Sequence, residues 1–222
     1  MERDALERLR ATVPPSTDAM VILGAQEGIL LADDQIKSSL LLNNPVGRDL
    51  QGHLRRIGVM IRIHDLCKRG DLPFKSEITK MPIGGWHWLE IKAPGIRSHV
   101  CRTDYAEAFP EDTPNKQDAR LVNPQGDLFK PRLAPLSEVL SAVAEMYCWL
   151  TYGATRDGKL THLCWTVPAA DQNSWLAHEN ILRGSSMNAP IPPPPGPDPK
   201  TKLRFRDYIE EALEKKDENE KA

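Results

Sequence analysis

Four polar residues, two before and two after one turn, could together carry out acid–base chemistry on a phosphate ester. Glu90 and Lys92 precede the turn Ala93-Pro94-Gly95, and Arg97 and His99 follow it. If the flanking segments are paired strands, alternate side chains project from one face, and these four lie together there. A carboxylate, an imidazole and a guanidinium can accept the proton of a 2′-hydroxyl, protonate the leaving oxygen and stabilise the charged phosphorane. The pattern predicts a metal-independent ribonuclease site that needs no cofactor, with Glu90, Arg97 and His99 as catalytic residues.

Aromatic side chains at the same spacing predict that this face also binds bases. Trp86 and Trp88 share a strand face with Lys92, and Arg102 lies near the end of the return strand. Aromatic rings stack on unpaired bases, and cations bind the phosphates between them. We therefore expect Trp86, Trp88, Lys92 and Arg102 to bind nucleic acid, with RNA as the partner. The competing interpretation is an ordinary exposed strand face in which His99 is a structural residue of the sheet.

The order of segments in this region is similar to that of a known family. A helical segment, Arg62 to Gly70, is followed by Leu72-Pro73-Phe74, by Gly84-Gly85-Trp86 to Lys92, and by Gly95-Ile96-Arg97. In this order the segments resemble the middle of RelE/HigB-type toxins, over residues 62–103. The resemblance implies a small sheet-and-helix fold, cleavage of mRNA by basic and hydrophilic sheet residues, and an antitoxin as partner.

Two further hypotheses remain open. The order Asp71, Glu90, Lys92 matches that of metal-dependent nucleases, in which the carboxylates hold Mg²⁺ and the lysine positions the attacking water. Alternatively the chain performs no chemistry and is a binding or regulatory protein that recruits partners. The sequence contains no glycine-rich phosphate loop, nucleophile elbow or dinucleotide fingerprint to favour other enzyme classes.

Charge is distributed unevenly along the chain. The formal net charge is −2, but residues 48–103 contain eleven Lys and Arg against five Asp and Glu, a local charge of +6. A concentrated positive field attracts phosphates, whereas the same charges on a solvated helix face would bind nothing. The candidate site lies inside this basic third of the sequence.

Hydrophobic periodicity predicts the elements that position these residues. Helical spacing is followed by strand-like alternation twice, which indicates an α+β domain containing an antiparallel sheet built from two hairpins packed against helices. The second hairpin turns at Asp157-Gly158. The expected helices are 1–13, 33–42, 48–67 (ending at Gly70, or with a strand over its second half) and 136–146, and the expected strands are 85–92, 97–103, 147–155 and 160–167.

The polar segment 104–132 is longer than an inert connector needs to be, so we expect an ordered functional loop there. Composition then changes sharply after the expected globular domain, 1–183. Residues 184–199 are rich in proline and predict an extended linker, and residues 200–222 predict a charged amphipathic helix.

The charged amino terminus and the short apolar segments predict neither a secretory signal nor a membrane span. The four cysteines show no CxxC spacing, and three of them lie in strand-like segments, which indicates reduced, mostly buried thiols. Together these features predict a cytoplasmic protein with no membrane partner.

The apolar stripe Phe205, Ile209 and Leu213 predicts that the carboxyl-terminal helix binds a protein partner or a second copy of the chain. A helix this short is marginal by itself in water, so its stripe needs a covering surface. Truncation after Gly184 should leave thermal unfolding of the domain unchanged but reduce self-association or partner capture, measured by analytical ultracentrifugation and pull-down. A large fall in the melting temperature of the dilute truncated monomer would contradict this prediction.

Overall fold

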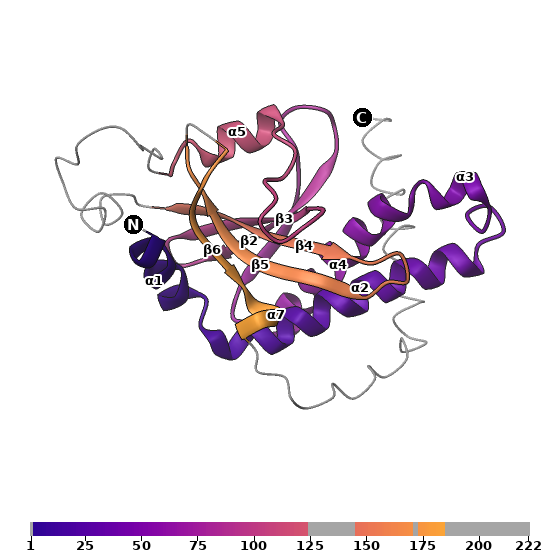
Figure 1. Ribbon diagram of the computed structural model, residues 1–222, viewed down its shortest axis with the longest axis horizontal. Helices are drawn as coiled ribbons and strands as arrows, with labels where there is room; N and C mark the ends of the chain where they lie inside the picture. Colours follow the sequence, from indigo (N-terminus) through magenta and orange to yellow (C-terminus); the bar gives the residue numbers. More distant parts are fainter. Residues whose placement is uncertain (1, 124–144, 171–172, 185–222) are drawn as a thin grey trace, which may run out of the picture. The chain divides into compact units, whose positions relative to one another are not determined.

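A computed structural model describes residues 2–123, 145–170 and 173–184. It confirms an α+β fold, with a six-stranded mixed sheet and helices on both of its faces (Figure 1). The helices are α1 (Glu2–Thr12), the 3-10 turn η1 (Pro15–Thr17), α2 (Asp18–Ser38), α3 (Pro45–Arg48), α4 (Gln51–Arg69), α5 (Pro114–Arg120) and α7 (Ile181–Gly184). The strands are β1 (Lys75–Lys80), β2 (His87–Ala93), β3 (Ile96–Arg102), β4 (Met146–Ala154), β5 (Leu160–Pro168) and β6 (Trp175–Asn180).

The sheet consists of two three-stranded antiparallel meanders joined side by side. Strands follow the order β1-β2-β3-β4-β5-β6, and the central pair β3 and β4 is parallel, from Ile96 beside Met146 to Arg102 beside Tyr152. The expectation of a purely antiparallel sheet is therefore wrong. Parallel neighbours require a long crossover, and residues 103–145 supply it.

The two outer strands were not anticipated from the sequence. β1 is an edge strand of mostly polar and exposed residues, Lys75–Lys80, so it lacks the hydrophobic alternation that indicates a strand. β6 is short and follows directly after loop residues. Edge strands are commonly short and polar because such a surface discourages pairing with other chains.

The second expected helix is wrong in its extent. The sequence predicts a helix over residues 33–42 that begins at Asp33, but α2 begins at Asp18 and ends at Ser38. Asp33 lies near its carboxyl end, where it is buried against Arg55 rather than stabilising a helix amino terminus. In the third helix, α4 remains helical through Arg69 and ends on Gly70 with φ of 79°, so the strand alternative is also wrong.

Some expected features lie outside the described residues. These are most of the helix at 136–146, the linker at 184–199 apart from Gly184, which ends α7, and the carboxyl-terminal helix with Phe205, Ile209 and Leu213. Met146, the last residue of the first of these, begins β4.

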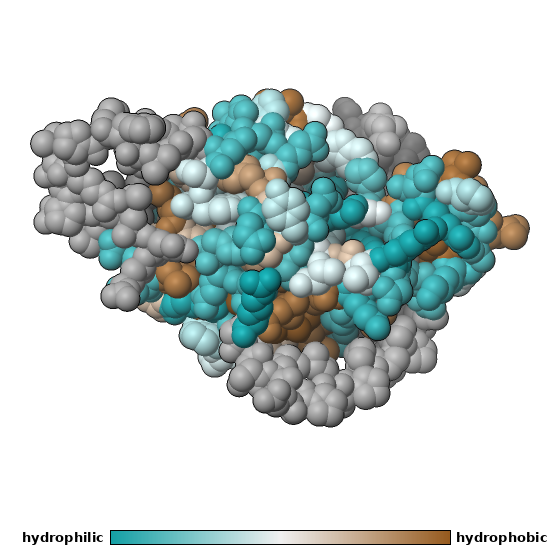
Figure 2. All heavy atoms as spheres, viewed as in Figure 1, coloured by the Kyte–Doolittle hydropathy of each residue, from teal (hydrophilic) through white to brown (hydrophobic). Residues whose placement is uncertain are grey.

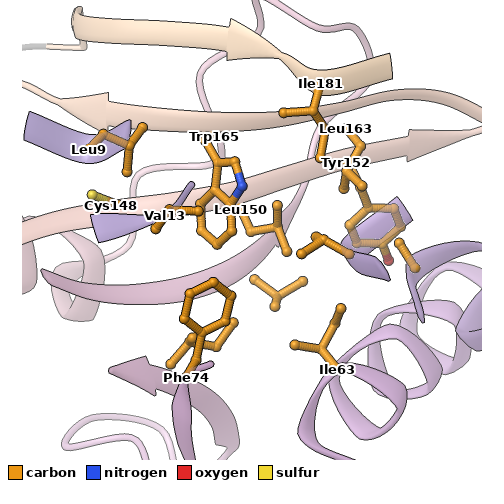
Figure 3. Close-up of a cluster of buried hydrophobic side chains, with 14 of the residues drawn as sticks. Leu9, Val13, Ile63, Phe74, Cys148, Leu150, Tyr152, Leu163, Trp165 and Ile181 are labelled. Carbon is orange, nitrogen blue, oxygen red and sulfur yellow. The ribbon is translucent and has the colours of Figure 1, made fainter. Parts of the chain in front are cut away.

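One face of the sheet packs against α1, α2 and α4 to form the main core. Figure 3 shows side chains from the strands, including Leu150 and Trp165, meeting Ile63 of α4 and Leu9 of α1. Trp165 is 1% exposed and Leu150 fully buried. Burial of each side chain of this size contributes about 1.5–3 kcal/mol. We call this the helix-covered face.

The opposite face carries a smaller aromatic cluster beneath α5. Trp149 and Tyr147 of β4 are fully buried there. Phe109 lies edge-on to Trp149 at 4.9 Å between ring centroids, and Trp175 completes the group. Figure 1 shows α5 on the side of the sheet away from α2 and α4. We call this the aromatic face.

A buried ion pair fixes the start of α4 against α2 and the β4–β5 turn. Arg55 donates to both carboxylate oxygens of Asp33 at 2.7 Å, and to the carbonyl oxygens of Thr155 and Arg156. Gly158 occupies the turn with φ of 86°, where a side chain would collide with Asp33. The turn predicted from Asp157-Gly158 therefore also docks onto the two helices.

The surface of the described residues is largely polar, with apolar side chains exposed where α2 passes into α3. Leu40, Leu41 and Val46 are 99%, 80% and 77% exposed, and brown spheres gather at that end of the molecule in Figure 2. No helix in the described ranges is long and apolar enough to cross a membrane. All four cysteines are free thiols, and Cys101, Cys148 and Cys164 are buried, as predicted.

Helices α2 and α4 cross at two glycines, which predicts that alanine at the crossing destabilises the domain although alanine favours helices. A Cβ on Gly28 would lie 2.5 Å from the carbonyl oxygen of Gly58, and a Cβ on Gly58 would collide with the carbonyl oxygen of Gly28. Gly58→Ala should therefore destabilise the domain by about 1–3 kcal/mol, measured by denaturant unfolding.

The matched control is Gly52→Ala in the first turn of the same helix. A Cβ there meets only the end of the Arg102 side chain, which can move. Alanine is intrinsically the better helix former by up to about 1 kcal/mol, so this variant should be at least as stable as the original. Equal destabilisation of both variants would contradict a backbone contact at the crossing.

Candidate functional site

A cleft of 660 Å³ opens between the start of α4, the β1–β2 connection, the end of β3 and the segment leading into α5. Asn115 ties two of these walls together: its side chain donates to the carbonyl oxygen of Ile83 and accepts from its amide, at 2.8 and 3.0 Å. The side chains that can recognise a ligand are His53, Arg56, Trp86, Trp88, His99, Arg102, Lys116 and Tyr147.

The register of β2 and β3 brings the predicted catalytic residues together. Glu90 lies opposite His99, and Lys92 opposite Arg97, on the aromatic face. A carboxylate oxygen of Glu90 lies 2.8 Å from Lys92 Nζ, and the other lies 3.5 Å from Arg97 Nη1. His99 Nε2 is 4.0 Å from Glu90 Oε1, too long for a hydrogen bond.

Glu90 is therefore neutralised by two cations. It is 8% exposed, so the pairing with Lys92 and Arg97 offsets the cost of burying its charge. The same contact raises the pKa of Lys92 above its usual range. This arrangement stabilises an ionised carboxylate but leaves it few free lone pairs with which to accept a substrate proton.

His99 is buried beneath Trp88. Their rings stack with 3.7 Å between centroids, and His99 is 2% exposed. Burial, with a smaller effect of Arg97 and Lys92, lowers the pKa of His99 from 6.5 to about 3. The imidazole is neutral at physiological pH, and its Nε2 has no hydrogen-bond partner within the described structure.

A hydrogen-bonded series of aromatic side chains holds the His99 ring. Trp149 Nε1 donates to the Tyr147 hydroxyl at 2.9 Å, and that hydroxyl lies 2.6 Å from His99 Nδ1. Burial raises the pKa of Tyr147 well above its usual range, so the hydroxyl keeps its proton and can donate it to Nδ1. That tautomer places the His99 proton on Nε2.

The predicted site residues divide into two groups. Trp86, Trp88, His99 and Arg102 line the cleft. Glu90, Lys92 and Arg97 lie beside it on the aromatic face and do not line it. Arg102 alternates onto the opposite sheet face from His99 and extends over Gly52 at the start of α4.

Several cleft residues were missed by sequence reasoning. Arg56 was counted within the basic third of the chain without a specific role, and Lys116 lies in the segment expected to be a functional loop. His53 is not among the residues that the sequence predicts for the site, although its ring lies nearly parallel to Trp86, at 15° and 6.2 Å between centroids. Charge density was the one signal that pointed to α4; nothing local indicated which turn of the helix would line the cleft.

The geometry gives the magnesium hypothesis no support. Asp71 pairs with Arg69 at 2.9 Å, and Glu90 pairs with Lys92 and Arg97. Within the described ranges, no three His, Cys, Asp or Glu side chains lie close enough together to hold a metal ion.

Comparison with known proteins found no matching family model, no matching curated protein and no matching solved structure. The resemblance of residues 62–103 to RelE/HigB-type toxins thus stays a prediction.

The buried position of His99 predicts a specific pH dependence. Unfolded His99 takes up a proton near pH 6.5 and folded His99 near pH 3, so the unfolded state binds more protons between these values. The free energy of unfolding should decrease as the pH falls from 6.5 toward 3. Burial lowers the pKa of His64 and His162 in the same direction.

Denaturant unfolding at pH 7 and pH 5 measures this loss, and ¹⁵N NMR of the imidazole rings assigns it. The His99 ring should remain neutral in the folded protein at pH 5. A folded-state titration of His99 between pH 6 and 7 would show that the ring is accessible to solvent and contradict the burial described above.

Proposed function

We propose that this protein binds single-stranded nucleic acid, RNA in particular, in the cleft between α4, β3 and α5. The observation that supports the proposal best is the composition of the cleft. Aromatic rings and three cationic side chains meet in one cavity, and none of those cations forms an ion pair with any residue that the structure describes. Arg56, Arg102 and Lys116 are these cations, and Lys116 also donates to the backbone carbonyl oxygen of Glu111 at 2.6 Å.

The aromatic side chains of the cleft suit unpaired bases. Trp86 is 60% exposed at the rim, beside the ring of His53, and Trp88 lies deeper over His99. An indole exposed to this extent does not gain the stabilisation that burial would give. Such exposure is typical of a ring that a ligand covers. Stacking of a base on such a ring contributes about 1–3 kcal/mol whatever the base.

The cations lie in the same cleft as the aromatic rings, where they could contact the phosphates between stacked bases. Arg56 and Arg102 face the cleft at the amino-terminal end of α4, which has no side-chain cap and no acidic residue in its first turn. The partial positive charge of a helix amino terminus adds to theirs. Two carboxylates, Asp49 and Glu111, also line the cleft and limit its net charge. Stacking should therefore contribute a larger share of the affinity than charge does.

Binding accords with the geometry better than cleavage does. Glu90 is occupied by Lys92 and Arg97, and His99 is a neutral ring held under Trp88. Cleavage is the second candidate because His99 lines the cleft and its buried Nε2 has no hydrogen-bond partner among the described residues. With its proton on Nε2, the neutral His99 ring could donate a hydrogen bond to a phosphodiester oxygen, but it could accept a proton there only in the other tautomer.

The test is binding of a fluorescent single-stranded RNA of about ten nucleotides, a length within the range of known single-strand sites, followed by anisotropy at several salt concentrations. Trp86→Ala should weaken binding about tenfold, in keeping with the loss of one stacked base. Arg56→Gln should weaken it and lower the slope of log K against log salt by about 0.7.

Lys68→Ala is the matched control, since it removes one exposed positive charge from the same helix. Position 68 lies sixteen residues from Gly52, which corresponds to about 24 Å along α4. This variant should bind as the original does. No retention of RNA or single-stranded DNA even at low salt would refute the proposal, and an equal effect of all three variants would show non-specific attraction.

The same samples test cleavage. Activity that survives EDTA and is lost in His99→Ala or Glu90→Gln, with the fold intact, would establish the metal-independent ribonuclease. Activity abolished by EDTA and restored by Mg²⁺ would instead require metal ligands that the described residues do not bring together.

A further inference from the structure

A second, smaller pocket adjoins the cleft. It has a volume of 270 Å³ and shares Gly52 and Arg102 with the cleft as lining residues. The pocket lies on the helix-covered side of β4, between the start of α4 and the β4–β5 turn. Its remaining walls are formed by Gln51, Arg55, Tyr152, Ala154 and Arg156.

The charge in this pocket is strongly one-sided. Arg55, Arg102 and Arg156 line it, and no carboxylate does. Arg55 is neutralised by Asp33 behind it. Arg102 and Arg156 are exposed and form no ion pair with any residue of the described ranges, so two positive charges remain uncompensated. A phosphate monoester carries about −1.5 to −2 at pH 7, which matches them.

A buried tyrosine whose hydroxyl has no partner among the described residues also lines this pocket. Tyr152 is 1% exposed, lines the pocket, and its hydroxyl makes no hydrogen bond with any residue that the structure describes. Figure 3 shows Tyr152 among the buried side chains of the helix-covered face. Burial raises the pKa of Tyr152, so the hydroxyl keeps its proton even beside arginines. A buried donor left unsatisfied costs about 1–3 kcal/mol, and an anionic oxygen in the pocket would satisfy it.

Because residue 52 is glycine, the Arg102 side chain has room to extend to the pocket. A Cβ at position 52 would collide with Arg102 Nη1, so only glycine lets the guanidinium lie over the first turn of α4. The uncapped amino terminus of this 19-residue helix adds its partial positive charge at the same place.

We propose that this basic pocket binds a terminal phosphate monoester, with Tyr152, Arg102 and Arg156 as its ligands. The inference rests on the proposed function, because the adjoining cleft would hold the nucleotide that carries the phosphate. It adds that the protein recognises the phosphorylated end of a strand, or a free nucleotide, rather than an internal stretch. A bridging phosphodiester carries one negative charge, offers two unbridged oxygens and would leave one arginine uncompensated.

The first test compares three single-stranded RNAs of the same sequence on the full chain: one with a 5′-phosphate, one with a 3′-phosphate and one with hydroxyl groups at both ends. One phosphorylated end should bind about tenfold more tightly than the hydroxyl-ended strand, as one charge-assisted contact set provides. Equal affinity of all three strands would overturn the proposal while leaving the proposed function intact.

Variants assign the preference to the pocket. Tyr152→Phe removes only the hydroxyl, and Arg156→Gln only the charge; each should abolish most of the preference and change affinity for the hydroxyl-ended strand less than twofold. Lys159→Gln is the control, because this exposed lysine lies three residues from Arg156 and does not line the pocket. Persistence of the preference in both pocket variants would overturn the assignment.

The last measurement does not depend on RNA binding. Inorganic phosphate, at constant ionic strength, should raise the unfolding temperature of the original protein, and should do so much less in Tyr152→Phe and Arg156→Gln. If this shift occurs and no RNA binds, the pocket stands and the proposed function fails. If the variants respond to phosphate and bind a phosphorylated strand as the original protein does, the pocket is not a phosphate site.

Discussion

The bidentate ion pair between Arg55 and Asp33 determines where helix α4 begins relative to the sheet. Both groups are buried, and the guanidinium also donates to two carbonyl oxygens of the β4–β5 turn. Removal of one partner from a buried pair leaves an uncompensated charge and costs about 3–5 kcal/mol. The pair thus links α2, α4 and one end of the sheet into a unit that tolerates little displacement.

The position of this unit sets the geometry of both candidate sites. Gly52, His53 and Arg56 occupy the first turns of α4, immediately around Arg55, and so are held at the rim of the cleft. Because Asp33 neutralises Arg55, the positive charge of the smaller pocket comes from Arg102 and Arg156 alone. This one buried ion pair therefore positions the first turns of α4, and the charges of Arg102 and Arg156 stay available to a phosphate.

The two faces of the sheet use their polar residues differently. On the helix-covered face, polar groups are few, and the Tyr152 hydroxyl has no hydrogen-bond partner within the described ranges. On the aromatic face, Glu90, Lys92, Arg97 and His99 are bound to one another or to Tyr147. Paired groups of this kind hold one another in place, which suits a support beside a binding cleft more than a set of groups that must exchange protons during a reaction.

Features that depend on residues close together in the chain could be predicted from the residue types. Glycines at 70, 95 and 158 have φ of 79°, 72° and 86°, and each ends a helix or closes a hairpin where the local residues indicated. The period of two in β2 and β3 placed Glu90 opposite His99, because alternation and a tight turn fix the register. Tertiary structure alone decided the parallel pairing of β3 with β4, the extent of α2, and the walls of the cleft. These depend on contacts between residues far apart in the chain, such as Asn115 with Ile83 and Arg55 with Thr155, and no local pattern of residue types encodes which distant partner will be met.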